Sequence, residues 1–287
     1  MENLRGIAFM IAAMAAFAVE DVLIKMLASS LPISQILIIV GTMTGSFCCV
    51  VAVITKTRLL MPELTDTAVI VRFLTDTFAT LFFVYALALI PLSSISAIIQ
   101  AAPLLITLGA IVFFKEKVGI RHWMAIVFGF VGVILILRPG SEAFTPASLL
   151  AVVATVFMAA RDLSTRLITA QIPTLTISTY SFLGAAIAGV IALPFDGPFS
   201  YPNSSKWIHL TTICLVAGLS NFMLILATRH GDASVIAPFR YTRIVFAMIL
   251  AVFVMHESPP WQTLLGAAII LSSGCYILSR KGLFLQV

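Results

Sequence analysis

Residues 18–25 read AVEDVLIK, and residues 159–166, which lie 141 positions later, read AARDLSTR. The shift places alanine on alanine, aspartate on aspartate, and Lys25 on Arg166. It also aligns a pair of prolines and a pair of glutamates: Pro32 with Pro173, and Glu116 with Glu257. Self-similarity at a fixed shift indicates that one structural unit is present twice. The chain is therefore predicted to consist of two related halves, residues 1–140 and 141–287.

The composition excludes a soluble protein. Of the 287 residues, 61% are hydrophobic and 10% are charged, whereas soluble domains carry about 25% charged residues. The net charge of +5 comes from Lys and Arg residues that form no run or patch, which argues against nucleic acid as a partner. The four cysteines lie in apolar runs without metal-binding spacing, so neither a metal site nor a cofactor is predicted.

A helix that crosses the bilayer needs about 20 mostly apolar residues. Turn residues and charges divide this chain into ten such stretches: 5–27, 33–55, 68–89, 93–114, 119–137, 147–168, 174–194, 206–228, 233–255 and 261–279. The fold class is thus predicted to be an all-α membrane protein with ten transmembrane helices. Each half holds five spans, and an odd number forces the second half to enter the membrane upside down. The two five-helix repeats are therefore predicted to be inverted, the arrangement of many secondary transporters.

The positive charges predict the orientation. With the N-terminus in the cytoplasm, ten of the 17 Lys and Arg residues fall on the cytoplasmic side. Three fall on the outer side, at span ends or in loops, namely Lys25, Arg138 and Lys206, and the other four lie deeper within spans. The positive-inside rule then places both termini in the cytoplasm, and the predicted location is a bacterial inner membrane.

The end of the fourth span and the whole fifth span of each half have a familiar sequence. They read PLLITLGAIVFFKEKVGIRHWMAIVFGFVGVILI (103–136) and PFRYTRIVFAMILAVFVMHESPPWQTLLGAAIILSSGCYIL (238–278). These segments resemble the two EamA repeats of the drug/metabolite transporter superfamily. In that family a glutamate ends the fourth helix, matched by Glu116 and Glu257, and the fifth helix is rich in small residues. The small residues matched here are Gly129, Gly132, Gly266 and Gly274. The resemblance implies a transporter with one EamA-like unit in each half.

Several charged residues lie inside the predicted spans, where each needs a partner or a water-filled cavity. Asp21 and Lys25 are four residues apart, as are their repeat counterparts Asp162 and Arg166, so each pair lies on one helix face. Both pairs are predicted to be structural ion pairs. Arg72 and Asp76 have the same spacing but no counterpart in the other half, and they are candidates both for structure and for substrate binding.

Glu20 and Arg161 occupy equivalent positions in the two halves but carry opposite charges. A structural duty common to both halves would keep the sign of the charge. Glu20 and Arg161 are therefore predicted to lie at a central substrate cavity. The alternative is a direct bridge between them across the pseudo-two-fold axis.

Arg240 and Arg243 lie three residues apart in the ninth span, and neither has a carboxylate in its own helix. Two guanidinium groups that face one cavity suit an anionic ligand group, which they can bind in a bidentate manner. The alternative is that Asp76, Glu20 or Asp162 neutralises them. Pro238 predicts a broken helix beside them, and Pro103 predicts the same for the fourth span. Gln100 and Tyr241 complete the predicted substrate site.

The predicted function is secondary transport of a small organic metabolite by alternating access, with export as the predicted direction. Two alternatives stay open: a channel-like facilitator, and an intramembrane enzyme, for which no catalytic motif is present. The predicted partners are a small-molecule substrate and the lipid bilayer. The sequence does not distinguish a monomer from a homodimer, and proton coupling and simple exchange fit it equally.

Overall fold

The computed structural model describes residues 2–115, 119–140, 144–168, 172–230 and 233–284, and within them it contains helices and turns but no strand. The α-helices are α1 (Glu2–Ala28), α2 (Ile33–Ile54), α3 (Thr67–Leu89), α4 (Leu92–Ile99), α5 (Ala102–Phe114), α6 (Ile120–Leu137), α7 (Pro146–Thr165), α8 (Thr174–Ala192), α9 (Ser204–His230), α10 (Ala233–Ile236), α11 (Thr242–Phe253) and α12 (Trp261–Phe284). The 3-10 helices are η1 (Pro62–Thr65), η2 (Leu193–Phe195) and η3 (Ala237–Tyr241).

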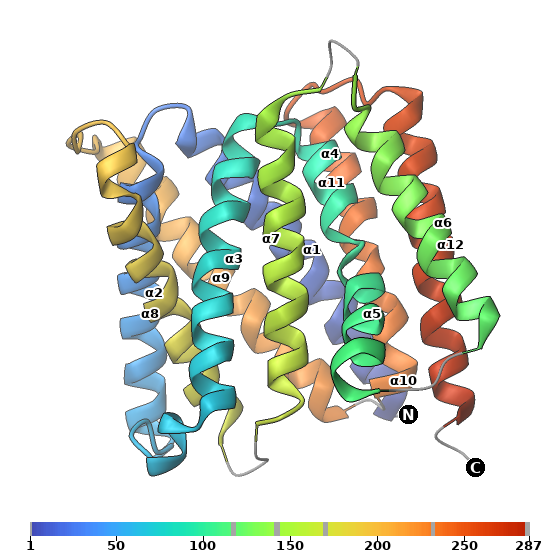
Figure 1. The fold of residues 1–287 in the computed structure, drawn as a ribbon. Helices are drawn as coiled ribbons and strands as arrows, with labels where there is room; N and C mark the ends of the chain where they lie inside the picture. Colours follow the sequence, from blue (N-terminus) through green and yellow to red (C-terminus); the bar gives the residue numbers. More distant parts are fainter. Residues whose placement is uncertain (1, 116–118, 141–143, 169–171, 231–232, 285–287) are drawn as a thin grey trace.

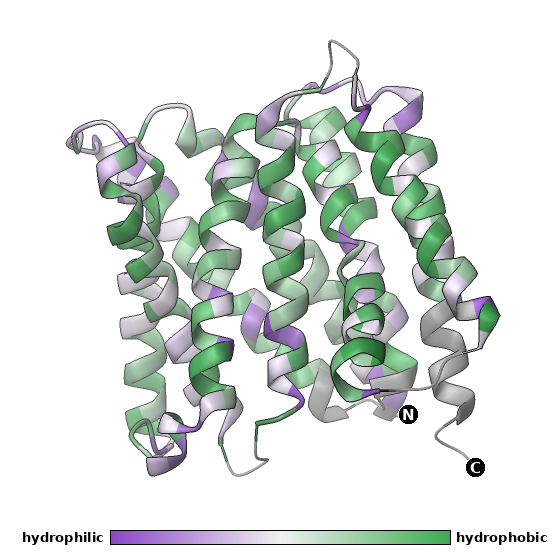
Figure 2. Ribbon diagram, viewed as in Figure 1, coloured by the Kyte–Doolittle hydropathy of each residue, from purple (hydrophilic) through white to green (hydrophobic). Residues whose placement is uncertain are grey.

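Seven helical stretches of the described chain are long and apolar enough to cross a bilayer. They are Asn3–Ala28, Ile33–Ile54, Thr67–Leu89, Leu92–Phe114, Pro146–Thr165, Thr174–Phe195 and Ser204–Ala227. Trp123–Leu137 is a shorter apolar helix. Apolar residues cover most of each long helix, and hydrophilic residues gather at the helix ends and at a few places inside the bundle (Figure 2). The protein is therefore an all-helical, multi-pass membrane protein.

The helices form two layers in which each half packs against the other (Figure 1). In one layer α3 lies between α8 and α7, and in the other α9 lies between α2 and α1. The first helix of each half thus packs against the third long helix of the other half, because α1 contacts α9 and α7 contacts α3. The layers meet where α2 packs on α8 and where α6 packs on α12.

Both predicted helix breaks are present, and they fall at equivalent positions. In the first half, α4 ends at Ile99 and α5 begins at Ala102, with Pro103 in its first turn. In the second half, η3 carries Pro238 and separates α10 from α11. The 141-residue shift places Gln100 of the first break on Tyr241 of the second. Proline removes a backbone donor and obstructs the preceding turn, which explains why each span breaks near its own proline.

Two close helix crossings depend on glycine. A Cβ on Gly41 of α2 would lie within 2.9 Å of three backbone atoms of Phe182 and Ala186 on α8. On the other side of the bundle, a Cβ on Gly132 would lie 2.8 Å from the carbonyl oxygen of Gly266. The backbones of these helix pairs approach as closely as small residues permit. The two crossings join the layers on opposite sides of the bundle.

Candidate functional site

The charged residues predicted from the sequence lie on α1, α3, α7, η3 and α11, in the part of the bundle where the two layers face each other. Several of them are only partly covered, although they lie well inside their helices. Four of these side chains have between 16% and 26% of their surface exposed: Arg72, Arg161, Asp162 and Arg243. Partial exposure of guanidinium and carboxylate groups within spans is typical of a region that water can enter.

Asp21 of α1 is buried and binds Arg243 of α11. The Nη2 of Arg243 donates to both carboxylate oxygens at 2.8 Å, and its Nε donates to Oδ2 at 3.2 Å. The rings of Phe17 and Phe83 cover the guanidinium, with centroids 5.2 Å and 5.7 Å away. This bridge, which joins a helix of each half, is a largely buried and well-oriented ion pair.

The predicted pair of Asp21 with Lys25 is therefore wrong. The Lys25 ammonium instead donates to the carbonyl oxygens of Leu87 and Ile90, at 2.8 Å and 2.6 Å, where α3 ends. The last carbonyls of a helix lack partners within the helix and carry partial negative charge, so a nearby cation stabilises them. The sequence placed Lys25 and Asp21 on one helix face, but contacts with other helices determine the partner of each.

A second charge network joins α3 to α7. Arg161 donates to Asp76 at 3.0 Å and pairs with its neighbour Asp162 at 2.9 Å. The predicted pair of Arg72 with Asp76 is present at 3.7 Å, and Arg72 also donates to the Thr165 hydroxyl at 2.9 Å. Asp162 thus binds the adjacent Arg161, whereas its predicted partner was Arg166.

Glu20 lies beside this region on α1. The Ser220 hydroxyl of α9 donates to its Oε2 at 3.4 Å. The direct Glu20–Arg161 bridge does not form, because Arg161 binds Asp76 and Asp162. The two residues nevertheless make equivalent connections, since each joins the first helix of its half to the third long helix of the other half.

The residues at the helix breaks have different surroundings. Arg240 is exposed, and its carbonyl oxygen accepts a hydrogen bond from Gln100 at 3.5 Å. Tyr241 has 6% of its surface exposed, and its hydroxyl contacts α12 where Gly274 leaves room. The structure thus brings Gln100 and Arg240 together and places the Tyr241 ring against α12.

The loops of the second half cap helices of the first half, which the sequence did not reveal for Asp196. Its carboxylate accepts hydrogen bonds from Ser34 N–H at the start of α2 and from the Tyr85 hydroxyl, at 2.5 Å and 2.6 Å. The Glu257 carboxylate accepts from Leu92 N–H and Ser93 N–H at the start of α4, at 2.6 Å and 3.0 Å. A carboxylate at a helix N-terminus satisfies orphan amide donors. For Glu257 the sequence signals were its repeat match and the family resemblance, and its counterpart Glu116 lies outside the described residues.

The Glu257 cap leads to a testable expectation. Glu257→Ala is expected to lower the free energy of unfolding by about 1–3 kcal/mol, because the amides of Leu92 and Ser93 lose their acceptor. Glu257→Gln keeps one acceptor oxygen and loses the charge, so a smaller loss of about 0.3–1 kcal/mol is expected. Thermal melting of the purified variants measures both, with Ser258→Ala in the same exposed turn as control. Equal stability of Glu257→Ala and the control would show that the cap contributes nothing.

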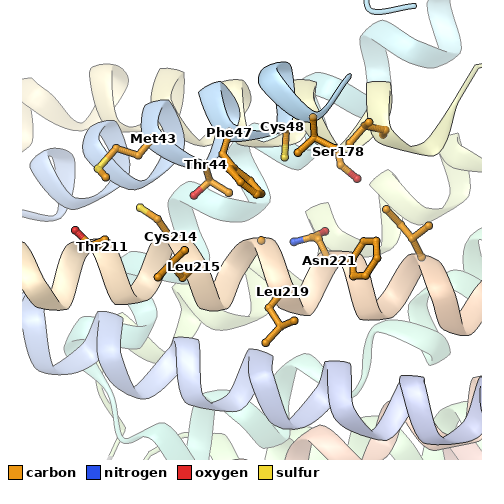
Figure 3. Close-up of a pocket in the computed structure, with 15 residues that line it drawn as sticks. Met43, Thr44, Phe47, Cys48, Ser178, Thr211, Cys214, Leu215, Leu219 and Asn221 are labelled. Carbon is orange, nitrogen blue, oxygen red and sulfur yellow. The ribbon is translucent and has the colours of Figure 1, made fainter. Parts of the chain in front are cut away.

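A separate groove of about 540 Å³ lies between α2, α8 and α9 (Figure 3). Met43 and Phe47 of α2 and Leu215 and Leu219 of α9 line it, with Thr44 and Asn221 among its few polar groups. None of the charged residues predicted for the substrate site lines this groove. Its volume would hold a drug-sized molecule, but its walls offer no charge.

Comparison with known proteins identifies the family. The EamA-like transporter family matches residues 4–138 and 145–280. An S-adenosylmethionine uptake transporter of Rickettsia conorii is 28% identical over 195 residues, which are 68% of this chain and 65% of that protein. A riboflavin transporter of Vibrio cholerae is 30% identical over 183 residues, which are 63% of this chain and 60% of that protein. The matched segments therefore span less than two thirds of either relative.

A solved crystal structure has the same fold, with a TM-score of 0.65, 18% identity, and coverage of 98% of both chains. The two family matches span nearly the whole sequence. They define the chain, by family, as a membrane transporter. The chain belongs to the EamA-like transporter family, within the drug/metabolite transporter superfamily, and it is not an enzyme.

Proposed function

We propose that this protein is a secondary transporter that moves a small organic metabolite by alternating access between two inverted repeats of five spans. The packing of the helices carries the proposal. The first helix of each half packs on the third long helix of the other, and the broken fourth spans coincide under the 141-residue shift. Such interleaved halves suit rocking of one repeat against the other around a site between them.

Loop contacts support the inverted relation of the halves. Gln35 near the start of α2 exchanges hydrogen bonds with the backbone of Ser200 in the second half. Thr176 near the start of α8 donates to the carbonyl oxygen of Arg58 in the first half at 2.8 Å. Gln35 and Thr176 are 141 residues apart, which is one repeat. Their partners, Arg58 and Ser200, are 142 residues apart. Because α2 and α8 start at opposite ends of the bundle (Figure 1), the two contacts lie at opposite ends.

The orientation with cytoplasmic termini in an inner membrane rests on the distribution of Lys and Arg. In a protein without its four native cysteines, Tyr201→Cys is expected to react with an impermeant thiol reagent in intact cells. Leu4→Cys is expected to react only after permeabilisation. Both wild-type side chains are exposed, with relative exposures of 101% and 72%. Labelling of position 4 alone in intact cells would show that the protein has the opposite orientation.

The substrate site is proposed between α1, α3, α4, α7, α9 and η3–α11. Its proposed residues are Glu20, Arg72, Asp76, Gln100, Arg161, Arg240 and Arg243. The guanidinium of Arg243 is bound to Asp21. Arg240 is therefore the main candidate to bind an anionic group of the substrate. The names of the relatives favour a metabolite of the size of S-adenosylmethionine or riboflavin. The name of the Rickettsia relative favours uptake over the export predicted from the sequence.

Counterflow in proteoliposomes tests the transport mechanism. Vesicles that are preloaded with unlabelled S-adenosylmethionine or riboflavin should accumulate the labelled compound transiently above equilibrium. A channel-like facilitator, the second candidate function, would equilibrate the label without an overshoot and without saturation. Protein-free vesicles provide the baseline, and an absence of saturable flux for both compounds would contradict transport of metabolites of this kind.

A further inference from the structure

Most of the central charged groups bind one another in ion pairs. Asp21 pairs with Arg243, and Asp76 pairs with Arg161 and Arg72, while Asp162 pairs with Arg161. Among the described residues, Glu20 and Arg240 make no ion pair within 4 Å. Within the part of the chain that the structure describes, the only hydrogen bond of the Glu20 carboxylate is the long one from Ser220. The Arg240 side chain is exposed.

These two groups flank the same bridge. Glu20 is the residue before Asp21 on α1, and Arg240 lies one 3-10 turn before Arg243, on η3, which packs against α1. Because Asp21 and Arg243 are joined at 2.8 Å, the bridge limits how far apart the free carboxylate and the free guanidinium can be.

A charge inside a membrane protein needs a partner or water around it, and a ligand that fills the site displaces that water. The two unpaired groups have opposite signs, so a neutral ligand would leave both uncompensated, and a simple anion or cation would leave one. A zwitterion neutralises both at once. Arginine binds a carboxylate through two parallel hydrogen bonds, while a carboxylate binds a cationic group by charge alone.

We infer that the transported metabolite is a zwitterion, whose carboxylate binds Arg240 and whose cationic group binds Glu20, with the Asp21–Arg243 bridge fixing the spacing between them. This inference rests on the proposed transport function and specifies its substrate class. S-adenosylmethionine has this chemistry, because its amino-acid end carries a carboxylate near an ammonium and a sulfonium group. Riboflavin carries no charge and does not have it.

The test combines changes in the protein with changes in the ligand. Probes are S-adenosylmethionine, its decarboxylated analogue and riboflavin, applied to the purified full-length protein and to Glu20→Gln and Arg240→Gln. Exposed or peripheral matched controls are Glu63→Gln in η1 and Arg121→Gln at the start of α6. The readouts are the ligand-induced rise in melting temperature, which any ligand of the folded state produces, and the half-saturating concentration in counterflow.

The decarboxylated analogue is expected to bind wild type about tenfold or more weakly than S-adenosylmethionine, because a charge-assisted contact is lost. Arg240→Gln should weaken S-adenosylmethionine by a similar factor and leave the analogue nearly unchanged. Glu20→Gln should weaken both. The inference is overturned if Arg240→Gln affects both ligands equally or neither, or if riboflavin alone is bound and transported. A lack of saturable flux for every probe would instead contradict the transport function itself.

Discussion

Asp21→Ala is expected to be the most destabilising single change among the central charges, by about 3–5 kcal/mol, because it leaves Arg243 in the membrane interior without its carboxylate. The faces of Phe17 and Phe83 would remain beside the guanidinium. Cation–π contacts contribute about 0.5–2 kcal/mol and cannot replace the lost charge partner. Thermal melting of detergent-purified protein should rank this variant lowest. Asp66→Ala, at an exposed N-cap without a side-chain hydrogen bond, is the matched control.

The double variant Asp21→Ala/Arg243→Ala separates the ion pair from simple loss of packing. Removing both charges eliminates the unpaired guanidinium, so the double variant should be more stable than the sum of the single changes predicts. Arg243→Lys keeps the charge but loses the bidentate geometry, and an intermediate loss is expected. Strictly additive losses, or an Asp21→Ala protein as stable as wild type, would show that the bridge does not hold α1 to α11.

The second large effect is expected at Gly41. Replacement by leucine should prevent α2 from packing on α8, because even a Cβ at this position would collide with backbone atoms of Phe182 and Ala186. Backbone cannot move aside as a flexible side chain can, so the helices would have to separate. Gly41→Ala is expected to cost about 1–3 kcal/mol for overpacking, and Gly41→Leu should yield little folded protein. Yield and size-exclusion profiles after detergent extraction measure this.

Gly45, one turn away on the same helix, is the matched control. A Cβ there would lie 3.5 Å from the nearest atom, a side-chain carbon of Leu183, which is ordinary van der Waals contact. Gly45→Ala should therefore be neutral, or stabilising by up to about 1 kcal/mol through higher helix propensity. If Gly41→Ala and Gly45→Ala had the same effect, close approach of the α2 and α8 backbones would not explain the sensitivity of Gly41.

The sequence by itself determined much of the architecture. Apolar runs and their punctuation located the helices, since bilayer thickness and backbone hydrogen bonding leave a hydrophobic chain little choice but helices of about 20 residues. The prolines predicted both breaks, at Gln100–Ala101 and at η3. These features depend on residues close together in the chain.

Only the tertiary structure decided which charges are partners. Spacing along one helix predicted Asp21 with Lys25 and Asp162 with Arg166, because residues four apart share a face. A partly buried ionic group instead takes the partner with the best geometry and the least exposure to water, and in this protein those partners come from other helices or the adjacent residue. Arg243 thus binds Asp21, 222 residues away, whereas Glu20 and Arg240 make no ion pair within the part of the chain that the structure describes. Side-chain pairing across helices depends on how the two halves pack, and no local pattern in the chain encodes that arrangement.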